Sequence, residues 1–198
     1  MTAQYEDKVI FNNDQYALSG WQGGNLFHPR QFGLQPGMTS TACYRGFICT
    51  YVISDDSLFL QELLTNDQRK IYPPVNGVDP KPVTRRYIQK DKDGEWREKT
   101  ETVKGVREYS DIELLIPYTG RLRIAKDLVS GQHINMGFQK PSAYKTVFDL
   151  FVFKGQVSEI TDRSKEMEKR RGEFKKKYES GPYSKTIRDA FLRGIDLI

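Results

Sequence analysis

Residues Thr41 to Leu64 read TACYRGFICTYVI, SDDS and LFLQELL, and this stretch decides the fold class. Its first arm is long, nearly uncharged and rich in aromatic and β-branched residues, which fit the packed surface of a strand. Asp55 and Asp56 lie between the arms, where short polar side chains tolerate turn geometry. The second arm begins by alternating apolar and polar residues. The stretch therefore predicts a β-hairpin whose first arm is buried on both faces.

Two other segments repeat this outline of apolar arm, polar turn and alternating arm. They are LIPYTGRLRIAKDL at 115–128 and LFVFKGQVSEITD at 150–162. Further short strands are predicted over Lys8–Phe11, Gln15–Ser19 and His133–Phe138. Together these patterns predict about eight to eleven short, mainly antiparallel strands in a curved sheet, a sandwich or a barrel-like arrangement.

The chain changes to a helical pattern after Asp162, a plausible N-cap. The run RSKEMEKRRGEFKKKY predicts one helix, and a second is expected from Tyr183, with Ile187, Phe191, Ile195 and Ile198 on one side. Strands followed by helices indicate the α+β class. We therefore expect an antiparallel β domain over 1–161 and a C-terminal helical appendage of two helices over 162–198.

A basic hairpin is expected at about 82–105, because Asp93-Gly94 is a strong hairpin signal between two strand-like runs. Its arms contain few apolar residues, so we expect it to protrude. Tyr87 and Trp96 are its large side chains, and Arg97 lies beside the tryptophan. Because Trp, Tyr and Arg are the usual anchors of protein interfaces, these three residues are candidate partner-binding residues. Phe191 and Ile195 of the second expected helix join them.

Composition limits the class of protein. The chain has 198 residues and a net charge of +5, which fits one domain with an appendage. Counting charges gives nine Lys and Arg against five Asp and Glu over 81–107, and eight against four over 162–178. No long apolar run is present, and the N-terminus lacks the pattern of a signal peptide. Cys43 and Cys49 are too far apart on one strand for a disulfide. We therefore expect a cytoplasmic protein.

The catalytic inventory is poor. A Cys–His nucleophile has no local support, since neither cysteine lies at a predicted helix N-terminus. Two histidines and two cysteines without metal-site spacing predict no metal centre, and no phosphate-binding glycine motif is present. No catalytic residue, metal or cofactor is expected. Whether the chain is an enzyme stays open, but this inventory favours a protein that is not one.

The first expected helix is the basis of a nucleic-acid hypothesis. Its cations could neutralise phosphates, whereas the glutamates between them favour a solvated helix held by its own ion pairs. The candidate residues are Lys169, Arg170, Arg171, Lys175, Lys176 and Lys177.

A third hypothesis places a ligand cleft under the aromatic, glycine-rich loop 20–37. Its candidate residues are His28, Arg45 and His133. An arginine in an otherwise apolar strand must point outward or meet a carboxylate, so we expect Arg45 to reach an acid such as Asp149 or to line a pocket with His28.

The leading functional prediction is a non-enzymatic protein–protein interaction module, such as an accessory or immunity-type subunit of a bacterial complex. The alternatives are a nucleic-acid-binding protein that uses the basic helix and the 82–105 hairpin, and a small-ligand binder or enzyme with a cleft under the 20–37 loop.

Overall fold

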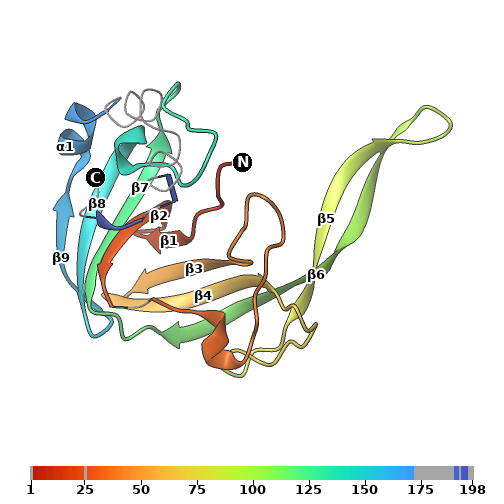
Figure 1. Cartoon of the computed structure of the whole chain (residues 1–198), viewed down its shortest axis with the longest axis horizontal. Coiled ribbons are helices and arrows are strands. Elements are labelled where there is room, and N and C mark those ends of the chain that lie inside the picture. The colour runs from red at the N-terminus through yellow and green to blue at the C-terminus, as the bar shows by residue number, and fades with distance from the viewer. Residues whose placement is uncertain (1, 25, 172–189, 192, 196–198) are drawn as a thin grey trace.

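The computed structural model describes residues 2–24, 26–171, 190–191 and 193–195. Their main element is one nine-stranded sheet in the order β3-β1-β2-β7-β8-β9-β4-β6-β5 (Figure 1). The strands are β1 (Lys8–Phe11), β2 (Asp14–Gly23), β3 (Phe47–Ser54), β4 (Ser57–Asn66), β5 (Lys81–Lys90), β6 (Trp96–Leu115), β7 (Gly120–Leu128), β8 (Tyr144–Phe153) and β9 (Gln156–Asp162). The helical elements described are η1 (Pro29–Phe32), η2 (Pro141–Ala143) and α1 (Ser164–Lys169).

The sheet curls until it closes. β3 pairs with β4 along its whole length, and β4 meets β9 at Ser57 and Gln156. The pairings β3-β1-β2-β7-β8-β9-β4 thus return to β3, and we call this ring the closed sheet. Nearly all its pairs are antiparallel, as expected, but β1 and β3 run parallel and make the sheet mixed.

Tight turns build the hairpins. At Asn12-Asn13, Asp55-Asp56 and Lys154-Gly155, both residues have positive φ. Two-residue loops of this kind match the right-handed twist of the strands they join. The turn predicted at Asp55 and Asp56 is therefore confirmed.

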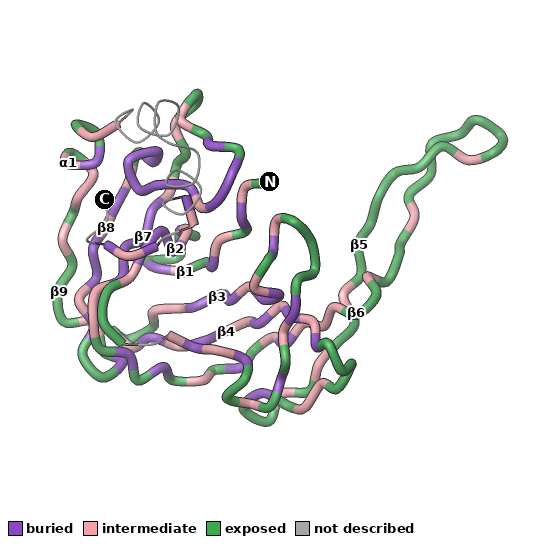
Figure 2. The backbone as a smooth tube through the Cα atoms, viewed as in Figure 1, coloured by how far each residue is buried: buried purple, intermediate pink, exposed green. Residues whose placement is uncertain are grey.

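The core fills the interior of the closed sheet. The central hairpin supplies much of it, with Cys49, Tyr51, Leu58, Leu60 and Leu63 almost fully buried. The loop between β2 and β3 covers this core and adds Phe27 and Leu34. Figure 2 shows the buried positions gathered in the closed sheet.

The predicted α+β class with two C-terminal helices is wrong. In the described part of the chain, the α-helix α1 is short and ends at Lys169. Its one buried apolar side chain is Met167, because apolar residues in this basic segment are sparse. Residues 183–189 lie outside the described part. Further on, Arg193 accepts a backbone hydrogen bond from Trp21 (3.0 Å), so the chain there runs beside β2.

The predicted strand His133–Phe138 is also wrong. The segment is a loop with one bridge, between Ala3 and Gly137. Its buried amides are satisfied locally instead, since the Gln139 side chain bonds both backbone groups of Ile134.

Residues 83–104 form a two-stranded hairpin that extends away from the closed sheet, and we call it the arm (Figure 1). β6 is continuous through both parts, since its residues from Val106 onward pair with β4. Figure 2 shows the arm almost wholly exposed.

Candidate functional site

One face of the arm carries large exposed apolar side chains. The register pairs Ile88 with Glu98 and Lys90 with Trp96, and directly opposed residues share a face. Ile88 and Trp96 are therefore diagonal neighbours, and they are 71% and 68% exposed. The arm adds nothing to the core that would account for them.

The opposite face is held together by charge. Arg97 pairs with Asp93 (2.6 Å) and Asp91 (3.3 Å), and Lys99 pairs with Asp91 (2.6 Å). Tyr87 lies there too, with the Arg85 guanidinium 5.8 Å from its ring centre. Of the predicted anchors, Trp96 is thus fully presented, whereas Tyr87 and Arg97 are engaged within the arm.

The charges of the arm are largely paired. Besides the pairs above, Arg85 meets Glu101 (3.0 Å) and Arg86 meets Glu98 (3.7 Å). A surface for nucleic acid needs cations that are available to phosphates. The paired arginines of the arm are therefore less available to phosphates than unpaired cations would be.

The basic segment after β9 is described only in part. Arg170 pairs with Glu166 (3.4 Å) and Arg171 with Glu168 (3.5 Å). Arg171 also donates to the Tyr144 carbonyl (3.1 Å). Lys175, Lys176 and Lys177 lie outside the described residues. Among the predicted phosphate-binding cations that the structure describes, Lys169 has no ion-pair partner, unlike Arg170 and Arg171. Nucleic-acid binding stays a prediction.

The two C-terminal anchors lie against the chain itself. Ile195 is 3% exposed and belongs to the interior. Phe191 is half-buried, and its ring meets that of Tyr44 edge-on at 6.4 Å. Ile195 is therefore not accessible to a partner, and Phe191 is accessible only in part.

Arg45 anchors a second candidate site. Its guanidinium donates through both terminal nitrogens to the Asp7 carboxylate, one of these bonds being 2.6 Å long. It also lies 4.6 Å from the centre of the Phe47 ring. The expectation that Arg45 meets a carboxylate is confirmed, but the acid is Asp7 rather than Asp149.

Asp7 is fully engaged. Beside Arg45, it accepts from the Cys49 backbone N–H (2.7 Å) and from Arg193 (3.3 Å). Burial opposes its charge, but the two guanidiniums and these hydrogen bonds together lower the pKa of Asp7 below its ordinary value. The carboxylate holds Arg45 in place and has no acceptor capacity left.

Two adjoining pockets share Trp21 and Arg45 as walls. The larger, about 590 Å³, also contains His28, and we call it the His28 pocket. The smaller, about 410 Å³, is mostly apolar and includes Phe191. The predicted grouping of His28 with Arg45 is thus present. His133 is exposed and lines neither pocket.

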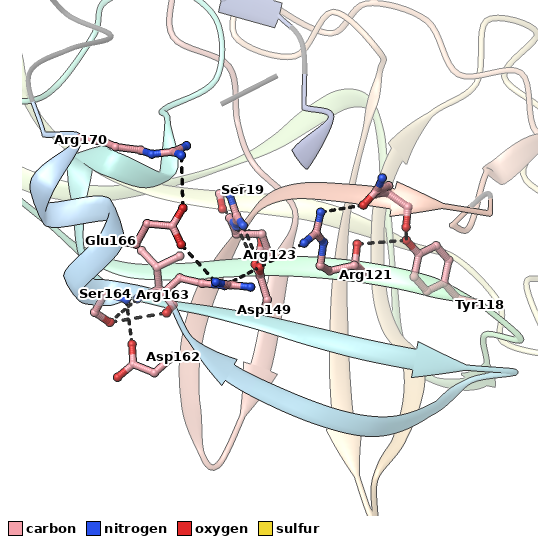
Figure 3. Close-up of polar contacts among 12 residues, drawn as sticks. Ser19, Tyr118, Arg121, Arg123, Asp149, Asp162, Arg163, Ser164, Glu166 and Arg170 are labelled. Atoms are coloured by element: carbon pink, nitrogen blue, oxygen red, sulfur yellow. Dashed lines mark hydrogen bonds and ion pairs between the residues drawn. The ribbon is translucent and has the colours of Figure 1, made fainter. Parts of the chain in front are cut away.

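A second buried ion cluster centres on Asp149 (Figure 3). Arg123 lies directly opposite it in the β7–β8 register and forms two hydrogen bonds of 2.6 and 2.7 Å. Arg163, just before α1, adds a bond of 3.2 Å. This cluster joins β7, β8 and the residue that precedes α1, and Asp149 lines neither pocket.

Both cysteines are free and buried. Burial raises the pKa of the Cys49 thiol well above its ordinary value, so it stays protonated at neutral pH. The described residues contain no group of three side chains suited to a metal ion. They also include no helix with the length and apolar character needed to cross a bilayer.

Sequence reasoning missed Asp7 and Arg193 because nothing local marks them. Asp7 stands in a polar leader, and Arg193 lies 186 residues away from it. The signal that was present is the isolated arginine in the CYRGF run, which implies an unseen carboxylate. Comparisons with protein families, curated proteins and solved structures find no match to this chain.

Proposed function

We propose that this chain is a non-enzymatic protein-interaction module that docks a protein partner through the arm. The observation that carries the proposal is the exposure of Ile88 and Trp96 on one face of a hairpin that adds nothing to the core. Interfaces concentrate their binding energy in a few large residues of this kind.

The surroundings of the two side chains support a protein interface. Polar residues frame them on the same face, at Thr84, Arg86, Lys90, Glu98, Thr100 and Thr102. An apolar centre with a polar rim is the usual anatomy of an interface. The partner is therefore expected to offer an apolar pocket for the Trp96 ring.

We further propose that the protein works within a larger assembly in the cytoplasm. An accessory subunit of a larger assembly fits a small closed sheet with one long projecting element. Free buried thiols at Cys43 and Cys49 fit a reducing compartment, so we place the protein in the cytoplasm.

The test is affinity purification of the tagged chain from its native cells, in the presence of nuclease. Ile88→Thr/Trp96→Thr removes the two anchors and keeps residues suited to strands. Phe153→Thr/Ile160→Thr is the matched control, because those residues are also exposed (60% and 48%) but lie on β8 and β9.

We expect one stoichiometric protein partner with the unmodified chain and with the control. Its recovery with the arm variant should fall at least about tenfold, as truncation of interface anchors typically does. Equal recovery with the arm variant, or loss of every partner on nuclease treatment, would refute the proposal.

A further inference from the structure

Donors outnumber acceptors among the polar groups of the His28 pocket: Arg30, Arg45 and His28 donate, Asp7 accepts, and Gln31 and Tyr51 can do either. Arg45 uses two of its five N–H groups on Asp7, and its remaining donors have no hydrogen-bond partner among the described residues. Arg30 lines the same pocket and forms no ion pair among the described residues. Asp7, the one carboxylate in the lining, is saturated. Two guanidiniums against one carboxylate leave a surplus positive charge.

His28 adds a further donor. Its Nδ1 accepts a hydrogen bond from the Arg30 backbone N–H (3.2 Å), so the proton of the neutral ring lies on Nε2. Partial burial and the nearby Arg30 and Arg45 lower the pKa of His28, which keeps the ring neutral at pH 7. Among the described residues, the side-chain donors of Arg30 and His28 therefore meet no acceptor.

Apart from Gln31, the rest of the lining is mainly apolar and aromatic. Trp21, Leu26, Phe27, Phe47 and Tyr51 form these walls. The size of about 590 Å³ lies in the range of small-molecule sites, which combine apolar walls with a few polar groups.

The guanidinium of Arg193, which lines the smaller pocket, is also incompletely satisfied. Arg193 lies between the Trp21 and Phe138 rings, 4.7 and 4.5 Å from their centres. Its Nε is buried without a hydrogen-bond partner among the described residues. Buried ion networks add little net stability, so stability alone gives a weak reason for this arrangement.

We infer that the His28 pocket binds a small organic anion, a carboxylate or phosphate carried on a flat apolar ring. The anionic group accepts from Arg45, Arg30 and His28, and the ring lies against Trp21 and Phe47. Guanidinium forks match both carboxylate and phosphate geometry. This inference is independent of the arm.

The chain has two tryptophans, so Trp96→Phe leaves Trp21 as a fluorescent reporter within the pocket. In that background we would titrate benzoate against benzamide, adenosine monophosphate against adenosine, and inorganic phosphate alone. The first pair tests a carboxylate and the second a phosphate. Each neutral counterpart has a similar ring, so the difference within a pair isolates the anionic group.

We expect saturable quenching or enhancement of Trp21 by at least one organic anion, with its neutral counterpart at least about tenfold weaker. Arg30→Gln should weaken that anion about tenfold, whereas Arg86→Gln, an exposed arginine on the arm, should leave it unchanged. Arg45→Lys should also weaken it, and because Arg30 is exposed, Arg30→Gln decides the matter if Arg45→Lys fails to fold.

Three outcomes would overturn the inference. They are no saturable response to any organic anion at millimolar concentration, equal binding of an anion and its neutral counterpart, and equal binding by Arg30→Gln and the unmodified pocket.

Discussion

Asp7 is the residue on which the interior depends most. It lies 3% exposed where Arg45, Arg193 and the Cys49 amide converge. Removing one member of a buried charge network leaves the others desolvated and unpaired, which costs far more than the network contributes as a whole.

Asp7→Asn is therefore expected to lower the free energy of unfolding by about 3 kcal/mol, measured by urea denaturation. Asp14→Asn is the control, because Asp14 pairs with Lys126 (2.5 Å) at the surface. That change should leave the urea midpoint nearly unmoved. An equal decrease in the free energy of unfolding in the two variants would show that the buried network stabilises the fold no more than a surface ion pair does.

Asp7 also makes the stability of the folded state depend on pH. Because the folded state lowers the pKa of Asp7 from 3.8, the unfolded chain takes up the proton first as pH falls. The contribution of Asp7 to the free energy of unfolding is therefore complete well above pH 3.8. It is lost as the pH falls from there through the lowered pKa of the folded state.

The unfolding free energy of the unmodified chain should hence fall more steeply below about pH 4 than that of Asp7→Asn. Burial raises the pKa of Glu6, so Glu6 acts in the opposite sense as pH rises through its own raised pKa. For this reason the test compares two variants that share Glu6. If the free energy of unfolding fell equally steeply below pH 4 in both proteins, Asp7 would not be the group responsible.

At the scale of elements, the turns carry much of the information about the fold. Asp56 has φ of 57° in the two-residue loop between β3 and β4. Glycine reaches that region without steric cost, whereas a β-branched side chain does not.

Asp56→Gly should stabilise the protein by about 0.5 kcal/mol, and Asp56→Val should destabilise it by about 1–2 kcal/mol. Ser54→Gly, in the adjoining strand, is the control and should destabilise. Chemical denaturation of the three variants tests this, and the reverse order for Gly and Val would rule out the proposed turn.

The arm is predicted to be dispensable for folding. Replacing residues 85–101 by Asn-Gly joins Thr84 to Thr102, which face each other in register. Because the arm is exposed and contributes nothing to the core, the melting temperature should change by less than about 3 °C. A collapse of the near-ultraviolet circular dichroism would mean that the arm supports the closed sheet.

At the scale of the whole molecule, sequence reasoning succeeded where signals are local. Asp93-Gly94, Asp55-Asp56 and the alternating runs beside them placed most of the strands. It failed where distant segments meet. The parallel pairing of Lys8 with Thr50 leaves no local signature. The spacing of Phe191 and Ile195 likewise does not show that Arg193 and Gly194 lie beside Trp21.

In the candidate sites too, local signals identified residues and contacts between distant segments were missed. Trp96 was identified because an aromatic residue in a charged hairpin has no core to join. His28 and Arg45 were grouped because a buried arginine demands a partner. His133 was added by residue type alone, and the structure places it elsewhere. Long-range neighbours such as Asp7 and Arg193 require the folded chain.

The central claim is that Trp96 becomes buried in a protein partner. The most direct measurement uses Trp21→Phe, in which Trp96 is the remaining tryptophan, titrated with the purified partner while acrylamide quenching is followed. We predict a shift of emission to shorter wavelength and a marked loss of quenching as the partner is added. Unchanged quenching of Trp96 at saturating partner would contradict the account.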